Sequence, residues 1–147
     1  MGIAVFQDRD LIYWSIKVLR GKWSSCKLRN TEEYLMKTMD RYDINALLIK
    51  RQLPSRSSRH LRLLVAAIKD VAKKRKAEIN YYELGELKTF FGADMKINKM
   101  DVAGAVVCQY KFLNDQLERE RNHKHPYFIR MFEAIAAGIL TVNRFNR

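Results

Sequence analysis

Residues 45–59, with the sequence NALLIKRQLPSRSSR, indicate both the fold and the kind of ligand to expect. The apolar run at 46–49 is typical of a strand that is covered on both faces. It stops at a basic, serine-rich turn that leads into a long cationic helix. Ligands of open α/β sheets collect at the carboxyl ends of such strands. Four cations stand at this end, Lys50, Arg51, Arg56 and Arg59. The stretch therefore predicts a site that holds phosphate.

Composition and charge narrow the class of protein. The chain of 147 residues is 48% hydrophobic and 30% charged, which indicates one globular domain over residues 1–147. Its net charge of +12 predicts a polyanionic partner. We expect no membrane partner, because no apolar run of roughly 18 residues is present. Two cysteines, Cys26 and Cys108, are too few for a metal site and favour free thiols in a reducing, cytoplasmic location.

The hydrophobic periodicity predicts the element order β-β-α-β-α-β-α-α-α. Segments 2–6 and 11–19 should form a β-hairpin around a polar turn. Thr31 is the predicted N-cap of the first helix, and Pro54 with Ser55 should cap the second. Further strands are predicted at 46–49 and 77–82, and further helices at 84–91, 98–113 and 128–143. A hairpin followed by αβαβ units predicts an α/β protein with a mixed sheet flanked by helices.

The predicted helix after Pro54 has an apolar side and a basic side. The basic side carries almost no compensating acid beyond Asp70, which favours nucleic-acid contact over a merely solvated face. The Ser57 hydroxyl beside it is a candidate donor to phosphate oxygens, with helix capping as its structural alternative. The complete set of expected nucleic-acid-binding residues is Lys50, Arg51, Arg56, Ser57, Arg59, Arg62, Lys69, Lys73, Lys99 and Arg130.

Four groups of short segments carry a resemblance to a known family. They are GIAVF at 2–6 with LIY at 11–13, ALLIK at 46–50, KTFFG at 88–92 with NKMDV at 98–102, and FEAIAAG at 132–138. Together they resemble the RuvC-type Holliday junction resolvases, a branch of the RNase H-like nuclease superfamily. The resemblance covers most of the chain. It implies an RNase H-like mixed sheet, with the β-hairpin first and αβαβ after it.

The resemblance also implies a chemistry. In that family, carboxylates hold two Mg²⁺ or Mn²⁺ ions, which activate water and stabilise the leaving oxygen of a phosphodiester. Glu133 stands at a matching acidic position, which makes it the candidate metal ligand and, together with Asp101, a candidate catalytic residue. Lys50 occupies the position of the family's second carboxylate, and the strand with the first aspartate would precede Met1. Whether this chain is an enzyme therefore stays open; if active, it is a divalent-metal-dependent endonuclease.

Both candidate carboxylates have structural alternatives, which we favour. Glu133 lies on an apolar helix face, so a buried carboxylate there needs a partner, expected to be Lys50, Arg51 or Arg130. Asp101 lies near a predicted helix start, where the helix dipole stabilises an anion.

Other conspicuous side chains have weaker claims to function. Trp23, in a loop rich in Lys and Ser, is a candidate for stacking on unpaired bases, whereas Tyr81 is expected in the core. His123 and His125 are expected in an exposed loop and not in a metal site.

The sequence thus favours a nucleic-acid-binding protein that holds branched or structured DNA, with DNA favoured over RNA. Two alternatives remain: a metal-dependent endonuclease of which this sequence is a truncated part, and a protein-interaction module with a basic face. Without the family's first strand the hairpin must pair with strand 46–49 directly, borrow a strand from another subunit, or leave an open edge. Because open edges invite pairing, a homodimer is also expected.

Overall fold

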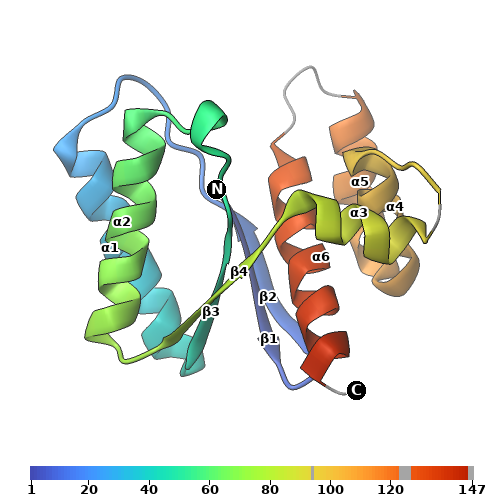
Figure 1. Ribbon diagram of the computed structural model, residues 1–147, viewed down its shortest axis with the longest axis horizontal. Helices are drawn as coiled ribbons and strands as arrows, with labels where there is room; N and C mark the ends of the chain where they lie inside the picture. Colours follow the sequence, from blue (N-terminus) through green and yellow to red (C-terminus); the bar gives the residue numbers. More distant parts are fainter. Residues whose placement is uncertain (94, 123–126, 146–147) are drawn as a thin grey trace. The chain divides into compact units, whose positions relative to one another are not determined.

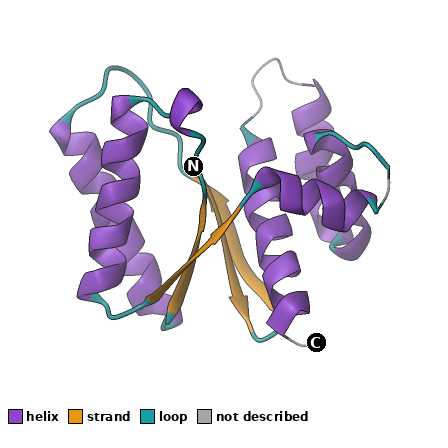
Figure 2. Cartoon of the chain, in the orientation of Figure 1, coloured by secondary structure: helices purple, strands orange, loops and turns teal. Residues whose placement is uncertain are grey.

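The computed structural model describes residues 1–93, 95–122 and 127–145. The chain divides into two compact units, and we describe each by itself: Met1–Val18 with Leu84–Arg147 forms the first, and Leu19–Glu83 the second. Figure 1 follows the chain through its elements, and Figure 2 separates helices from strands. Among the described helices, none has both the length and the apolar character that crossing a membrane requires.

The first unit is built on a β-hairpin and a long helix. Strand β1 (Gly2–Gln7) pairs antiparallel with β2 (Asp10–Ile16), which confirms the predicted hairpin but ends its second strand three residues early. Helix α6 (Phe128–Phe145) packs along the hairpin (Figure 1). Gly138 makes this contact close, because a side-chain carbon there would overlap the Phe6 ring.

Four shorter elements complete the first unit. Helices α3 (Leu84–Gly92) and α4 (Lys99–Gln109) are followed by the 3-10 turn η2 (Lys111–Leu113) and α5 (Asn114–Asn122). The fully buried side chains of the first unit include those of Phe132, Ile135, Leu87, Val106 and Leu113. The helix predicted at 128–143 thus corresponds to α6, which places an apolar face in this core.

The second unit is an α-β-α-β arrangement. Helix α1 (Ser25–Tyr42) leads to β3 (Ala46–Lys50), the 3-10 turn η1 (Pro54–Arg56), α2 (Arg59–Lys74) and β4 (Glu78–Tyr82). Strands β3 and β4 are parallel, with Ile49 opposite Tyr81 and Lys50 opposite Tyr82. Helices α1 and α2 pack side by side, and Leu35, Met39 and Val71 form the buried centre.

Two predicted helix caps were wrong. Helix α1 begins six residues before Thr31, and its N-cap is Ser24, whose side chain accepts a hydrogen bond from the Lys27 amide. Thr31 is instead buried inside the helix, where its hydroxyl donates to the Lys27 carbonyl at 2.9 Å. Pro54 starts only the short η1 turn, so the cap of α2 falls to Ser58, whose Oγ accepts from the Leu61 amide at 3.1 Å.

The architecture is α/β, as predicted, and it contains both antiparallel and parallel strand pairing, the two kinds that a mixed sheet combines. They form one antiparallel pair, β1 with β2, and one parallel pair, β3 with β4. Within the described residues, each sheet has two edges with no further strand from this chain, and a strand borrowed from another subunit stays a prediction. Sheets of two strands are marginal by themselves, so helix packing must supply most of the stability of each unit.

Candidate nucleic-acid interface

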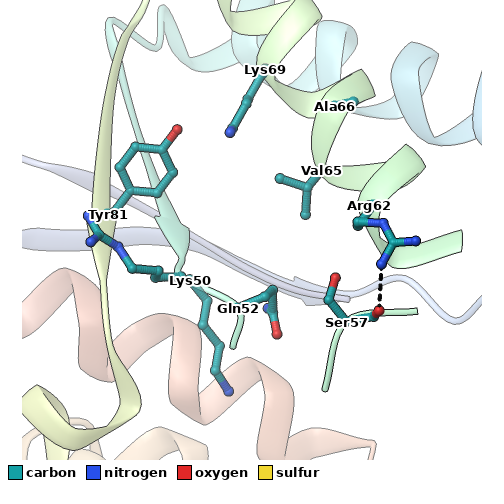
Figure 3. Close-up of a pocket in the computed structure, with 9 residues that line it drawn as sticks. Lys50, Gln52, Ser57, Arg62, Val65, Ala66, Lys69 and Tyr81 are labelled. Carbon is teal, nitrogen blue, oxygen red and sulfur yellow. Dashed lines mark hydrogen bonds between the residues drawn. The ribbon is translucent and has the colours of Figure 1, made fainter. Parts of the chain in front are cut away.

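The second unit contains a basic pocket at the carboxyl end of β3 (Figure 3). The pocket has a volume of about 450 Å³. Four of its lining residues are cations, Lys50, Arg51, Arg62 and Lys69. The rest of the lining is Gln52, Ser57, Val65, Ala66 and Tyr81. No acidic residue lines it in the described part of the chain, although Glu83 Oε1 lies 3.9 Å from Arg51 Nε, so the pocket presents net positive charge around a partly apolar wall.

Local structure explains why these cations meet. Lys50 ends β3, and the Arg51 amide continues the parallel pairing by donating to the Tyr82 carbonyl at 2.8 Å. Arg62 and Lys69 are seven residues apart on α2, close to two helical turns, so they share one face. The Arg62 guanidinium donates from Nη1 to the Ser57 carbonyl at 2.9 Å, as Figure 3 shows, which ties the loop to the helix.

Tyr81 organises two of the cations. The Arg51 guanidinium carbon lies 5.5 Å and the Lys69 ammonium 5.3 Å from the centre of the Tyr81 ring, both within cation–π range. The expectation that Tyr81 lies in the core was wrong, since the residue is 40% exposed; its neighbour Tyr82 is the buried one. Alternation along β4 explains this, because successive side chains point to opposite faces of a strand.

Not all of the predicted nucleic-acid-binding residues line the pocket. Within the second unit, Arg56 lies in η1 and Arg59 and Lys73 lie on α2; all three are exposed. The two others, Lys99 and Arg130, belong to the first unit, where they lie at the start of α4 and in the first turn of α6. The pocket therefore brings together five of the ten predicted residues: Lys50, Arg51, Ser57, Arg62 and Lys69.

Trp23 is already engaged in a stack. Its ring lies parallel to that of His60, with a centroid separation of 4.8 Å and an interplanar angle of 9°. A base that stacked on this face of Trp23 would have to displace the imidazole. The proposed contact with unpaired bases stays a prediction.

The two predicted catalytic carboxylates both have structural partners in the first unit. Glu133 is 7% exposed, and its Oε2 lies 3.5 Å from the Lys99 ammonium, a cation that was not among its three expected partners. Asp101 closes a capping box at the start of α4. Its Oδ2 accepts from the Asn98 amide at 2.8 Å, while its own amide donates to Asn98 Oδ1 at 2.9 Å.

The donor set does not fit the pair of metal ions that the family resemblance implies. Across the described residues, no three His, Cys, Asp or Glu side chains come close enough together to hold a metal ion. The family resemblance would place an acid at the end of β3, where the chain has Lys50, and Glu133 has Lys99 beside it. The positive charge of each lysine opposes the binding of a metal cation next to it. His123 and His125 lie outside the described residues.

Comparison with known proteins identifies the fold. No protein-family model and no curated protein matches the sequence. Among solved structures, Thermus thermophilus RuvC matches with a TM-score of 0.68 and 13% identity, over 99% of this chain and 88% of that one. T. thermophilus RuvC in complex with a Holliday junction substrate matches with the same TM-score and identity, over 99% and 87%. The chain has a RuvC-like fold.

Four residues that line the pocket of this RuvC-like chain were not predicted from the sequence. They are Gln52, Val65, Ala66 and Tyr81. Val65 and Ala66 belong to the turns of α2 between Arg62 and Lys69, so helical spacing alone could have found them. Tyr81 could have been found only from the register of β4 on β3, which places it opposite Ile49 and next to the residue that faces Lys50.

Proposed function

We propose that this protein binds nucleic acid, and that the pocket cations and the exposed face of α2 contact the phosphate backbone. The supporting observation is the pocket itself, in which four cations and no acidic residue gather at the strand end where α/β proteins hold their ligands. The net charge of +12 adds long-range attraction for a polyanion.

The proposed partner is DNA rather than RNA, in a branched or structured form. The reason is the likeness to RuvC, of which one matched structure holds a Holliday junction substrate. Pairing of a second copy at an open strand edge would give a homodimer suited to a two-fold junction, which we include in the proposal. The free, exposed thiols of Cys26 and Cys108 support a reducing, cytoplasmic location.

Binding can be tested by fluorescence anisotropy with labelled four-way junctions, duplexes and single strands at several salt concentrations. If each of the four pocket cations neutralises one phosphate, they contribute about −3.6 to the slope of log Kobs against log salt. The Arg62→Gln/Lys69→Gln variant should flatten the slope by about 2. Lys111→Gln/Arg119→Gln is the matched control, because it removes the same charge from exposed positions of the first unit.

The control variant should keep the steep slope. If both double variants bind like the native protein, the basic pocket is not the interface. If no nucleic acid binds at all, or binding does not respond to salt, a protein partner for the basic face becomes the better explanation.

A second candidate function is a metal-dependent endonuclease, favoured by the RuvC-like fold alone. The donor set described above speaks against metal binding by this chain. Incubation of four-way junctions with the protein and Mg²⁺ or Mn²⁺ tests it directly. Cleavage that is lost in Glu133→Gln would establish the enzyme, and intact junctions with retained binding would support the binding protein.

A further inference from the structure

The basic site is a pocket, and that shape limits what can enter it. At about 450 Å³ its volume is in the range of small-molecule sites. A volume of this size accommodates one nucleotide. A duplex can also contact the exposed cations around the pocket, but the size of the pocket suits a single nucleotide unit.

The charge of the pocket exceeds what one backbone phosphodiester requires. A phosphodiester carries one negative charge, whereas a phosphomonoester carries about −1.5 to −2 at neutral pH and offers three acceptor oxygens. Four cations line the pocket from two segments: Lys50 and Arg51 from the end of β3, and Arg62 and Lys69 from α2. Glu83 Oε1 lies 3.9 Å from Arg51 Nε and offsets part of this charge, but four cations beside one carboxylate still suit the higher charge of a phosphate that terminates a chain.

Three of the four cations make contacts with the protein before a ligand arrives. Arg62 is fixed by its hydrogen bond to the Ser57 carbonyl, and Arg51 and Lys69 are held near the Tyr81 ring. Figure 3 shows Arg62 and Lys69 on the same helix with Val65 and Ala66 between them. Side chains held in advance lose less conformational entropy on binding, which raises the affinity of a site.

The remaining wall suits the rest of a nucleotide. Val65, Ala66 and the partly exposed ring of Tyr81 provide apolar surface beside the cations. A sugar and base attached to the phosphate would contact this wall, which inorganic phosphate cannot use. The pocket thus combines the two chemical parts of a nucleotide.

We propose that this pocket binds the phosphomonoester of a nucleotide, either at the end of a nucleic-acid strand or on a free nucleotide. The strand-end form rests on the proposed nucleic-acid binding and deepens it, because it makes strand ends preferred over internal backbone. The pocket cations would then hold a strand end more tightly than internal backbone, which they contact together with the exposed cations outside the pocket.

The test compares short labelled single strands that differ only at one end. Strands with a 5′-phosphate, a 3′-phosphate or only hydroxyl ends are titrated with the full chain and followed by anisotropy. One phosphorylated form should bind about tenfold more tightly than the hydroxyl form, as expected for added charge-assisted hydrogen bonds. Unlabelled mononucleotide and inorganic phosphate are then added as competitors.

Two variants separate charge from shape. Lys69→Gln removes a pocket cation and should reduce the tenfold preference to about threefold or less, whereas Lys111→Gln, which removes an exposed cation of the first unit, should keep the preference. Ala66→Leu fills the pocket and keeps all four cations. Because Ala66 is exposed, this change leaves the core intact, and it should also abolish the preference.

Each outcome has a definite meaning. Competition by mononucleotide as strong as by the phosphorylated strand assigns the site to free nucleotides, and competition by the strand alone assigns it to strand ends. Equal binding of phosphorylated and hydroxyl strands by the native protein overturns the inference and leaves the proposed nucleic-acid binding standing. Failure to bind any strand or mononucleotide overturns both.

Discussion

The ion pair between Lys99 and Glu133 can decide whether Glu133 is a structural residue or a metal ligand. Glu133 is almost fully buried, whereas 40% of the Lys99 side chain is exposed, and the two charges are 3.5 Å apart. Coulomb's law at this separation allows about 5 kcal/mol at an effective dielectric constant of 20 and about 1 kcal/mol in water. Because Lys99 is well solvated, we expect about 2 kcal/mol.

The perturbation is Lys99→Met, which keeps the apolar stem of the side chain and removes its charge. It should lower the free energy of unfolding by about 2 kcal/mol, because a buried carboxylate loses its neutralising partner. Glu133→Gln should cost less, since it removes the buried charge and keeps a hydrogen-bond acceptor. The double variant should lie within about 1 kcal/mol of the native protein.

The assay is urea unfolding followed by circular dichroism, for the four proteins of this double-mutant cycle, with and without excess Mg²⁺. A structural pair predicts a coupling of about 1–2 kcal/mol and no effect of Mg²⁺. The reasoning is refuted if the coupling is close to zero. It is also refuted if Mg²⁺ stabilises the native protein and the stabilisation disappears in Glu133→Gln.

Three further predictions concern packing, pH and salt. Gly138→Ala should destabilise the protein by about 1–3 kcal/mol because the new methyl group overlaps the Phe6 ring. Gly104→Ala, also within a helix but with open space around it, should stabilise the protein by about 0.5–1 kcal/mol. Thermal unfolding of both variants provides the comparison. Burial, with a smaller contribution from the Asp10 carboxylate, raises the pKa of Tyr110 above its usual 10.0, so the folded state retains this proton longer than the unfolded state. The stability from Tyr110 is therefore present below the unfolded pKa and lost as pH rises through the folded pKa, and Tyr110→Phe should lessen the alkaline loss in urea unfolding at rising pH. Raising salt from about 50 to 200 mM should weaken DNA binding roughly 100-fold or more, measured by anisotropy, and a change of less than threefold would contradict backbone contact by the pocket cations.

Much of the fold could be predicted because its signals are local. The alternation of residues in β1 and β2, the apolar run of β3 and the helical spacing in α2 and α6 each lie within one segment. The positions of the helix caps were harder to predict from the sequence. Thr31 and Ser24 are both good capping residues, and only the tertiary structure shows that Thr31 is buried within α1 while Ser24 caps it.

The site was predicted in part for the same reason. Lys50 and Arg51 follow an apolar run, and Arg62 and Lys69 share a helix face, so their roles could be inferred from spacing. The partner of Glu133 could not, because Lys99 lies 34 residues away on another helix and the spacing gives no sign of it. The sequence favoured Lys50, Arg51 and Arg130 only because they stand in neighbouring motifs.

The sequence by itself determined that this protein is basic, that it alternates strands and helices as α/β proteins do, and that cations stand at the end of β3 where an acid of a metal site would be expected. These properties depend on residue identity and local periodicity. Only the tertiary structure decided that Tyr81 lies beside Arg51 and Lys69, that α2 and the β3 end line an open pocket, and that Lys99 pairs with Glu133. Those contacts depend on the register of β4 on β3 and on helix packing, which arise from burial of apolar surface between distant segments.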